Sequence, residues 1–144
     1  GVSIQLLLLC ECLQVKSNQV YAMIHKTLKA TARSCMVKVN GTEADLKYLR
    51  DDPPYPEKTS CILTCLLEKI GVVSDNKYSK VGFMTAVMPL VFRNTKKLQH
   101  MKNVSESCDK EVNDQHVSPC LLGSEITVCI YKYAPELQFS KHSH

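Results

Sequence analysis

Apolar residues recur three, four or seven positions apart along most of this chain, a spacing that places side chains on one face of a helix. The first such run is predicted to end at Asn40-Gly41, because glycine readily adopts the left-handed conformation that closes many helices. No segment alternates convincingly between apolar and polar residues, as a half-buried strand would. The pattern therefore predicts an all-α protein. The apolar positions of the first run are Val20, Met23, Ile24, Leu28, Cys35, Met36 and Val39.

Two more helices are predicted before the middle of the chain. Thr42 is a suitable N-cap for a short one, and Asp45 at the third position makes a weak capping box. Residues 51–56, with three prolines, break the helix and force an extended connection. A third helix is predicted from about Glu57 to Ile70, and Gly71 should end it. Because this helix is apolar over most of its circumference, it should be buried on most sides.

Three helices are predicted in the second half of the chain. Asp75-Asn76-Lys77 is interpreted as a turn, after which Ser79 can cap a fourth helix. Pro89 should end or kink that helix, because proline lacks the backbone N–H that the interior of a helix requires. A fifth helix follows Asn94. The last begins at Ser118-Pro119, with serine as the N-cap and proline in the first helical position.

The last predicted helix has one weak position and a clear end. Gly123 should weaken it locally, since glycine has a high entropic cost inside a helix. Pro135 should end it. The following tail, residues 136–144, is polar apart from Leu137 and Phe139.

The N-terminal residues predict a partial secretory signal. The apolar run Ile4–Cys10 is shorter than the roughly 20 residues that span a bilayer, but it matches the core of a signal peptide, about 7–15 residues. Small residues around Val15-Lys16-Ser17 place the predicted cleavage after Ser17. We therefore expect residues 1–17 to be a partial signal and residues 18–144 to be a single helical domain with a short C-terminal tail. A buried N-terminal helix is the alternative.

Composition narrows the class of protein. The 144 residues favour one domain, and the net charge of +4 is scattered, with only Lys96-Lys97 adjacent, so no nucleic-acid partner is expected. Eight cysteines in so short a chain indicate an oxidising compartment or a metal site. Removal of the signal would discard Cys10 and Cys12 and leave six, an even number that suits a secreted protein.

Helix geometry restricts how the six cysteines can pair. Cys61 and Cys65 lie one helical turn apart with parallel Cβ vectors, which is poor geometry for a disulfide between them. Cys120 and Cys129 are nine residues apart and so face opposite sides of the last helix. Six cysteines permit fifteen pairings, and these two arguments remove only the pairings within a helix.

Metal binding and catalysis receive little support. A zinc site usually needs two pairs of closely spaced ligands, and this sequence offers only one such pair. Nucleophile-elbow, phosphate-loop and metalloprotease motifs are missing from the sequence, and paired cysteines leave no thiol nucleophile. We therefore expect no enzyme, no cofactor and no metal. The residues of the zinc alternative are Cys61, Cys65, His100, Cys108, His116 and Cys120.

The spacing of the six cysteines resembles that of a known protein family. The six cysteines are separated by 25, 3, 42, 11 and 8 residues, and this spacing resembles that of the insect odorant-binding proteins. The segment from Cys61 to Gly71 is similar to that family's third helix, and Ser118-Pro-Cys120 with Cys129-Ile-Tyr-Lys is similar to its last helix. The resemblance covers roughly Val20 to Phe139. It implies a six-helix, disulfide-stapled domain that encloses an apolar cavity, with the pairs Cys35–Cys65, Cys61–Cys120 and Cys108–Cys129.

The resemblance also implies a function. It suggests a secreted, extracellular carrier, monomeric or homodimeric, that transports odorants, pheromones or similar lipophiles through aqueous fluid, with a membrane odorant receptor as a further partner. The basic net charge departs from the often acidic family, so a non-olfactory carrier is equally open. Members sometimes release ligand when a histidine is protonated, but nothing singles out His25, His100 or His116. Either Tyr131 or Tyr133 can supply a polar group for the ligand. The predicted ligand-binding residues are Met84, Val87, Met88, Val91, Leu98, Met101, Ile126, Ile130, Tyr133 and Phe139.

One alternative class and one type of modification stay open. A secreted, cytokine-like helical protein would act through its surface and would have a filled core, so uptake of an apolar fluorescent probe discriminates between the two. Two triplets are N-glycosylation acceptors, Asn40-Gly41-Thr42 and Asn103-Val104-Ser105.

Overall fold

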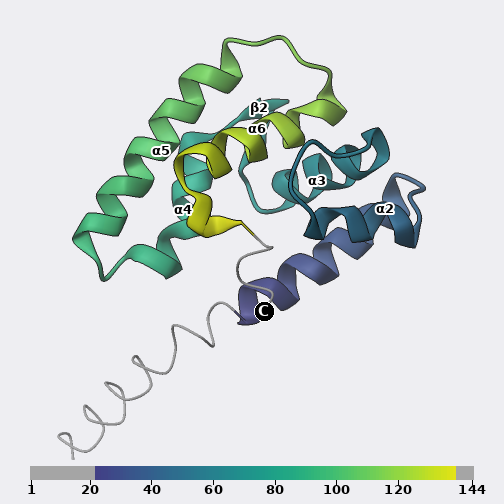
Figure 1. Ribbon diagram of the computed structural model, residues 1–144, viewed down its shortest axis with the longest axis horizontal. Helices are drawn as coiled ribbons and strands as arrows, with labels where there is room; N and C mark the ends of the chain where they lie inside the picture. The colour runs from purple at the N-terminus through teal and green to yellow at the C-terminus, as the bar shows by residue number, and fades with distance from the viewer. Residues whose placement is uncertain (1–21, 139–144) are drawn as a thin grey trace, which may run out of the picture.

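The computed structural model of the protein describes residues 22–138, and helices dominate that range. The predicted signal segment, residues 1–17, and Phe139 lie outside it. Six helices and three disulfides confirm the predicted all-α fold (Figure 1). The elements are the first helix (residues 22–38), α2 (Glu43–Lys47), a 3-10 turn (Tyr48–Arg50), α3 (Glu57–Lys69), β1 (Val73–Ser74), β2 (Lys77–Tyr78), α4 (Lys80–Val91), α5 (Thr95–Asn113), α6 (Pro119–Tyr133) and a 3-10 turn (Pro135–Leu137).

Local chemistry explains most helix boundaries. Thr42 and Asp45 form the predicted capping box, in which the Asp45 N–H donates to the Thr42 hydroxyl and the Thr42 N–H donates to the Asp45 carboxylate. Gly71 closes α3 in the left-handed region, at φ 87°. At the end of the first helix the left-handed residue is Asn40, at φ 59°, and not Gly41. Asparagine tolerates this conformation better than most residues, which explains the shift by one position.

Two details differ from the sequence pattern. A minimal antiparallel hairpin joins β1 and β2, with Asp75 and Asn76 in its turn, where both have positive φ. Two residues per strand are too few to produce a visible alternation. Helix α4 also continues through Pro89 for two more residues, to Val91. Proline therefore comes close to the end of α4 without ending it.

Among the elements from α2 onward, α3 and α6 form the most extensive pair. Most of α3 is buried, as its apolar circumference predicts, and it lies between the first helix and α6. Figure 1 shows α5 along one edge of the domain and the first helix along another, with α6 crossing between them. This arrangement makes α3 and α6 the framework on which the other helices rest.

A close backbone approach joins α3 to α6 at Gly123. The Gly123 N–H donates to the Thr64 hydroxyl at 2.9 Å, and that hydroxyl donates to the Cys120 carbonyl at 2.8 Å. The Ser60 hydroxyl donates to the same carbonyl and accepts from Ser124 at 2.7 Å. A Cβ atom at position 123 would lie 2.6 Å from the Thr64 hydroxyl oxygen. The residue predicted to weaken α6 is therefore the one that allows the two helices to touch.

Three disulfides tie four helices together with the pairing that the resemblance implies. Cys35–Cys65 joins the first helix to α3, and Cys61–Cys120 joins α3 to α6. Cys108–Cys129 joins α5 to α6. Among the long helices of residues 22–138, α4 alone carries no cysteine.

Candidate ligand-binding cavity

A cavity of about 450 Å³ lies between the first helix, α3, α4 and α6. Small-molecule sites commonly have volumes of roughly 300–1,000 Å³, so this one can hold a small organic ligand. Apolar side chains from all four helices make most of its wall. The main apolar lining residues are Ile24, Leu28, Leu63, Leu66, Leu67, Ile70, Phe83, Ala86, Val87, Leu90 and Ile130.

The periodicity of α3 and α4 explains how they supply this wall. On α4, Phe83, Val87 and Leu90 follow one another at intervals of four and three, so their side chains share one helix face. Leu66 of α3 and Ile70, its C-cap, are one turn apart and lie beside that face. Each helix thus contributes an apolar stripe, and the stripes enclose a space instead of interdigitating completely.

A few polar groups interrupt the apolar wall. Those with side-chain hydroxyls are Thr27, Thr85, Thr127 and Tyr131, and the first helix adds the imidazole of His25. Among residues 22–138, the lining includes no Asp, Glu, Lys or Arg. Such a wall suits binding by transfer of apolar surface from water, with one or two hydrogen bonds to orient the ligand.

The tyrosine on the wall has a second, partly buried tyrosine as its neighbour. Burial raises the pKa of Tyr55 above its ordinary value, and the nearby Tyr131 raises it further. The Tyr55 hydroxyl donates to the Asp51 carbonyl at 3.1 Å, in the connection between the short 3-10 turn and α3. The Tyr55 phenol therefore stays neutral at neutral pH.

The predicted ligand-binding residues separate into several environments. Val87 and Ile130 lie on the cavity wall. Packed in the core, and outside the lining set, are Val91, Met101 and Ile126, with Leu98 partly buried beside them. On the outer side of α4, Met84 and Met88 line a separate, more open hollow. Phe139 lies beyond the range that the structure describes.

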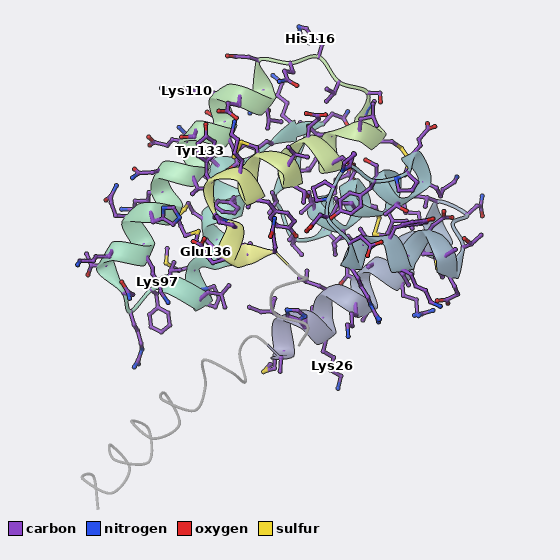
Figure 2. The ribbon with its side chains drawn as sticks, in the orientation of Figure 1. Lys26, Lys97, Lys110, His116, Tyr133 and Glu136 are labelled. Carbon is purple, nitrogen blue, oxygen red and sulfur yellow. A yellow bond between two sulfur atoms is a disulfide. The ribbon has the colours of Figure 1, made fainter. Side chains whose placement is uncertain are left out.

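Tyr133 faces α5 and takes part in a polar link between two helices. Its hydroxyl donates to the Glu111 carboxylate, which also accepts from the Lys132 ammonium at 2.8 Å. The Lys132 hydrogen bond and then that of Tyr133 hold the pKa of Glu111 below its ordinary 4.5. Figure 2 shows Tyr133 between α5 and α6, and Tyr131 is the tyrosine that lines the cavity.

The cavity wall includes several residues that the sequence pattern does not identify as ligand-binding. Leu66 and Leu67 of α3, Ile70 at its C-cap, and Ile24 and Leu28 of the first helix are absent from the predicted ligand-binding residues. The only available signal was that α3 is apolar almost all round, which is equally typical of a close-packed helix. Apolar periodicity identifies an inward face, but not whether atoms or empty space lie opposite it.

The part of the chain that the structure describes, residues 22–138, contains neither a membrane-spanning helix nor a metal-binding cluster. None of the helices in this range combines the length and the apolar character that crossing a membrane requires. No group of three or more His, Cys, Asp and Glu side chains in the same range is placed to hold a metal ion. The four cysteines of the zinc alternative are all used in disulfides.

Comparisons with known proteins agree on a family and a fold. The model of the PBP/GOBP family matches residues 17–133. Odorant-binding protein dmelOBP28a from Drosophila melanogaster is 18% identical, with a TM-score of 0.62 over 83% of this chain and 96% of that chain. Fatty acid binding protein OBP56a from the oral disk of the blowfly Phormia regina is 22% identical, with a TM-score of 0.63 over 78% of this chain and 93% of that one. No curated protein sequence matches significantly.

Proposed function

We propose that this chain, which belongs to the PBP/GOBP family, carries small hydrophobic ligands through aqueous fluid. The ligand would occupy the cavity between the first helix, α3, α4 and α6. The family is one of small-ligand carriers and not of enzymes. The observation that carries the proposal is the apolar, largely uncharged wall around about 450 Å³ of space.

The mechanism that this wall supports is partition. Each 100 Å² of apolar ligand surface removed from water contributes about 2.5 kcal/mol. Part of that gain offsets the loss of translational and rotational freedom of the ligand. Affinity should therefore rise with the apolar length of the ligand until the cavity is full.

The polar groups of the wall favour a ligand with a single polar end. Thr127 and Tyr131 on α6 and His25 on the first helix can donate or accept hydrogen bonds at the wall. The blowfly relative is named as a fatty acid binding protein. We propose fatty acids and similar single-headed lipophiles, odorants and pheromones among them, as the ligand class.

Secretion and delivery complete the proposal. Three disulfides in a chain of this size suit an oxidising, extracellular environment, and residues 1–17 supply the expected signal. Residues 18–144 then form the circulating carrier, and a membrane receptor is its expected destination. A cytokine-like protein would need a filled core, which the cavity does not favour.

Probe binding by a matched pair of α4 variants tests this function. Val87→Phe places a ring into the cavity, whereas Met88→Phe places the same ring on the outer side of the helix. We expect the first to weaken binding of an apolar naphthylamine probe at least about tenfold, or 1.4 kcal/mol, and the second to leave it nearly unchanged. Long-chain fatty acids should displace the probe from the wild-type protein.

A second variant protects the test against misfolding. Ala86→Leu also fills the cavity, and leucine is a good helix former, so this variant should fold as wild type does. Absence of probe uptake by oxidised, folded wild-type protein would overturn the carrier proposal. Unchanged binding by both cavity-filling variants would place the ligand elsewhere.

A further inference from the structure

Helix α4 is apolar on both of its faces. Phe83, Val87 and Val91 are buried on the inner face. On the outer face, Val81 is 70% exposed and Phe92, at the C-cap, is 54% exposed. A helix that is hydrophobic all round is normally buried in protein or lipid, so the uncovered outer face of α4 needs an explanation.

The outer face borders an open hollow between α4 and α5 of about 840 Å³. Met84 and Met88 form its floor, and both are flexible, polarizable side chains that adapt to varied partners. Val81 and Phe92 extend the same stripe along α4, at intervals of three and four residues from the methionines. Thr85, Pro89 and Ser105 complete the lining between two lysines, Lys80 and Lys102, and one carboxylate, Glu106.

The charged residues in and around α4 are all basic over a long segment of the sequence. Residues 76–105 hold six Lys and Arg residues and no Asp or Glu, and Glu106 is the next acidic residue. Three of the cations, Arg93, Lys96 and Lys97, are exposed where α4 passes into α5, and Figure 2 shows Lys97 at this outer corner. The Arg93 guanidinium lies over the Phe92 ring at 5.2 Å, which keeps charge and aromatic surface together.

We propose that the outer face of α4, together with the α4–α5 corner, docks on anionic lipid bilayers. Exposed Phe, Met and Val beside lysines and arginines are the side chains that bind the membrane interface, with apolar groups at the headgroup boundary and cations on the lipid phosphates. A second copy of the chain would bring the cations of this face, Lys80 and Lys102 in the hollow and Arg93, Lys96 and Lys97 at the corner, against the same cations, which disfavours a symmetric dimer through this face.

The location of α4 gives docking a direct relation to the cavity. Thr85 lines both the cavity and the outer hollow, so α4 is the wall that separates them. A docked carrier therefore presents to the bilayer the one cavity wall that lacks a disulfide. This connection to ligand transfer rests on the proposed carrier function, whereas docking itself does not.

Vesicle sedimentation tests the docking face. Oxidised protein is mixed with vesicles of phosphatidylcholine alone or of equal parts phosphatidylcholine and phosphatidylserine. We expect binding only to the mixed vesicles, and weaker binding as salt is added, because salt screens the attraction. Phe92→Asp, and Lys96→Glu with Lys97→Glu, should each lower the bound fraction at least about fivefold.

A charge-matched control separates this face from net charge. Lys26→Glu with Lys29→Glu makes the same change on the exposed side of the first helix, where Figure 2 places Lys26 away from Lys97. It should lower binding less than about twofold. An equal loss in the control, or no binding to the mixed vesicles, overturns the proposal and leaves the hollow to an acidic protein partner. Probe binding by the same variants, expected to be unchanged, separates this result from failure of the carrier function.

Discussion

Helices α6 and α4 border the same cavity but are held in opposite ways. Cys120 and Cys129 tie α6 to α3 and α5, and Gly123 brings its backbone against α3. Helix α4 has no cysteine and exposes apolar side chains to solvent. The domain thus places its cross-links where helices touch and leaves one wall of the cavity without any.

This difference explains how a small domain can tolerate unfilled space. Empty volume removes dispersion contacts and lowers stability, and small domains bury relatively little surface. Disulfides compensate by restricting the unfolded chain. The cavity is therefore sustained by the cross-linked frame of the first helix, α3, α5 and α6, while α4 contributes lining.

Removal of the α3–α6 disulfide should have the largest effect. Cys61→Ser with Cys120→Ser opens a cross-link between residues 59 positions apart, which should lower the free energy of unfolding by about 4 kcal/mol. Urea unfolding measures the change. Cys108→Ser with Cys129→Ser, across 21 positions, should lose about 3 kcal/mol. A loss below about 1 kcal/mol in the first pair would show that the frame does not depend on its cross-links.

Larger side chains should destabilise α6 more than α4. Gly123→Ala places a Cβ 2.6 Å from the Thr64 hydroxyl oxygen, and the helices must separate, at a cost of roughly 1–3 kcal/mol. Ala86→Leu adds more atoms to α4, but toward the cavity, and should change stability by less than about 1 kcal/mol. Thermal unfolding of both variants compares the two walls. Equal destabilisation would contradict the distinction between them.

The polar link between α5 and α6 should have the smallest effect, and one that depends on pH. Because its folded pKa is lowered, ionised Glu111 contributes stability above its ordinary pKa of 4.5, and this contribution is lost as the pH falls through the lower folded value. Glu111→Gln should therefore reduce the unfolding temperature slightly at neutral pH and converge with wild type in acid. Glu106→Gln, on the same helix, is the control. A constant difference at all pH values would assign the effect to packing.

The fold was largely predictable because its signals are covalent and periodic. Cysteine spacing and apolar intervals indicated six helices, and caps such as Thr42 and Gly71 fixed several ends. The hairpin of β1 and β2 was not predictable, since its strands are shorter than one clear alternation. Pro89 misled slightly, because its fixed φ is compatible with a helix, so α4 continues to Val91 although proline removes one backbone N–H donor.

The cavity wall was harder to predict than the fold. Val87 and Met88 are adjacent and both apolar, yet one lines the cavity and the other faces the outer hollow. Because α4 is apolar on two faces, its sequence does not say which face is inside. Met101 and Ile126 illustrate the second difficulty: both face inward, but neighbouring side chains pack around them and separate them from the empty space.

The connectivity of α3 has a consequence for synthesis of the chain. Cys35 pairs with Cys65, although Cys61 emerges from the ribosome four residues earlier. Cys61 must then wait for Cys120, 59 residues later. Cys61 therefore has no native partner until Cys120 is made, and a Cys35–Cys61 bond formed before then would have to be exchanged for the native pair. A chain that terminates before α6 leaves the Cys61 thiol without its partner, free to compete with Cys65 for Cys35.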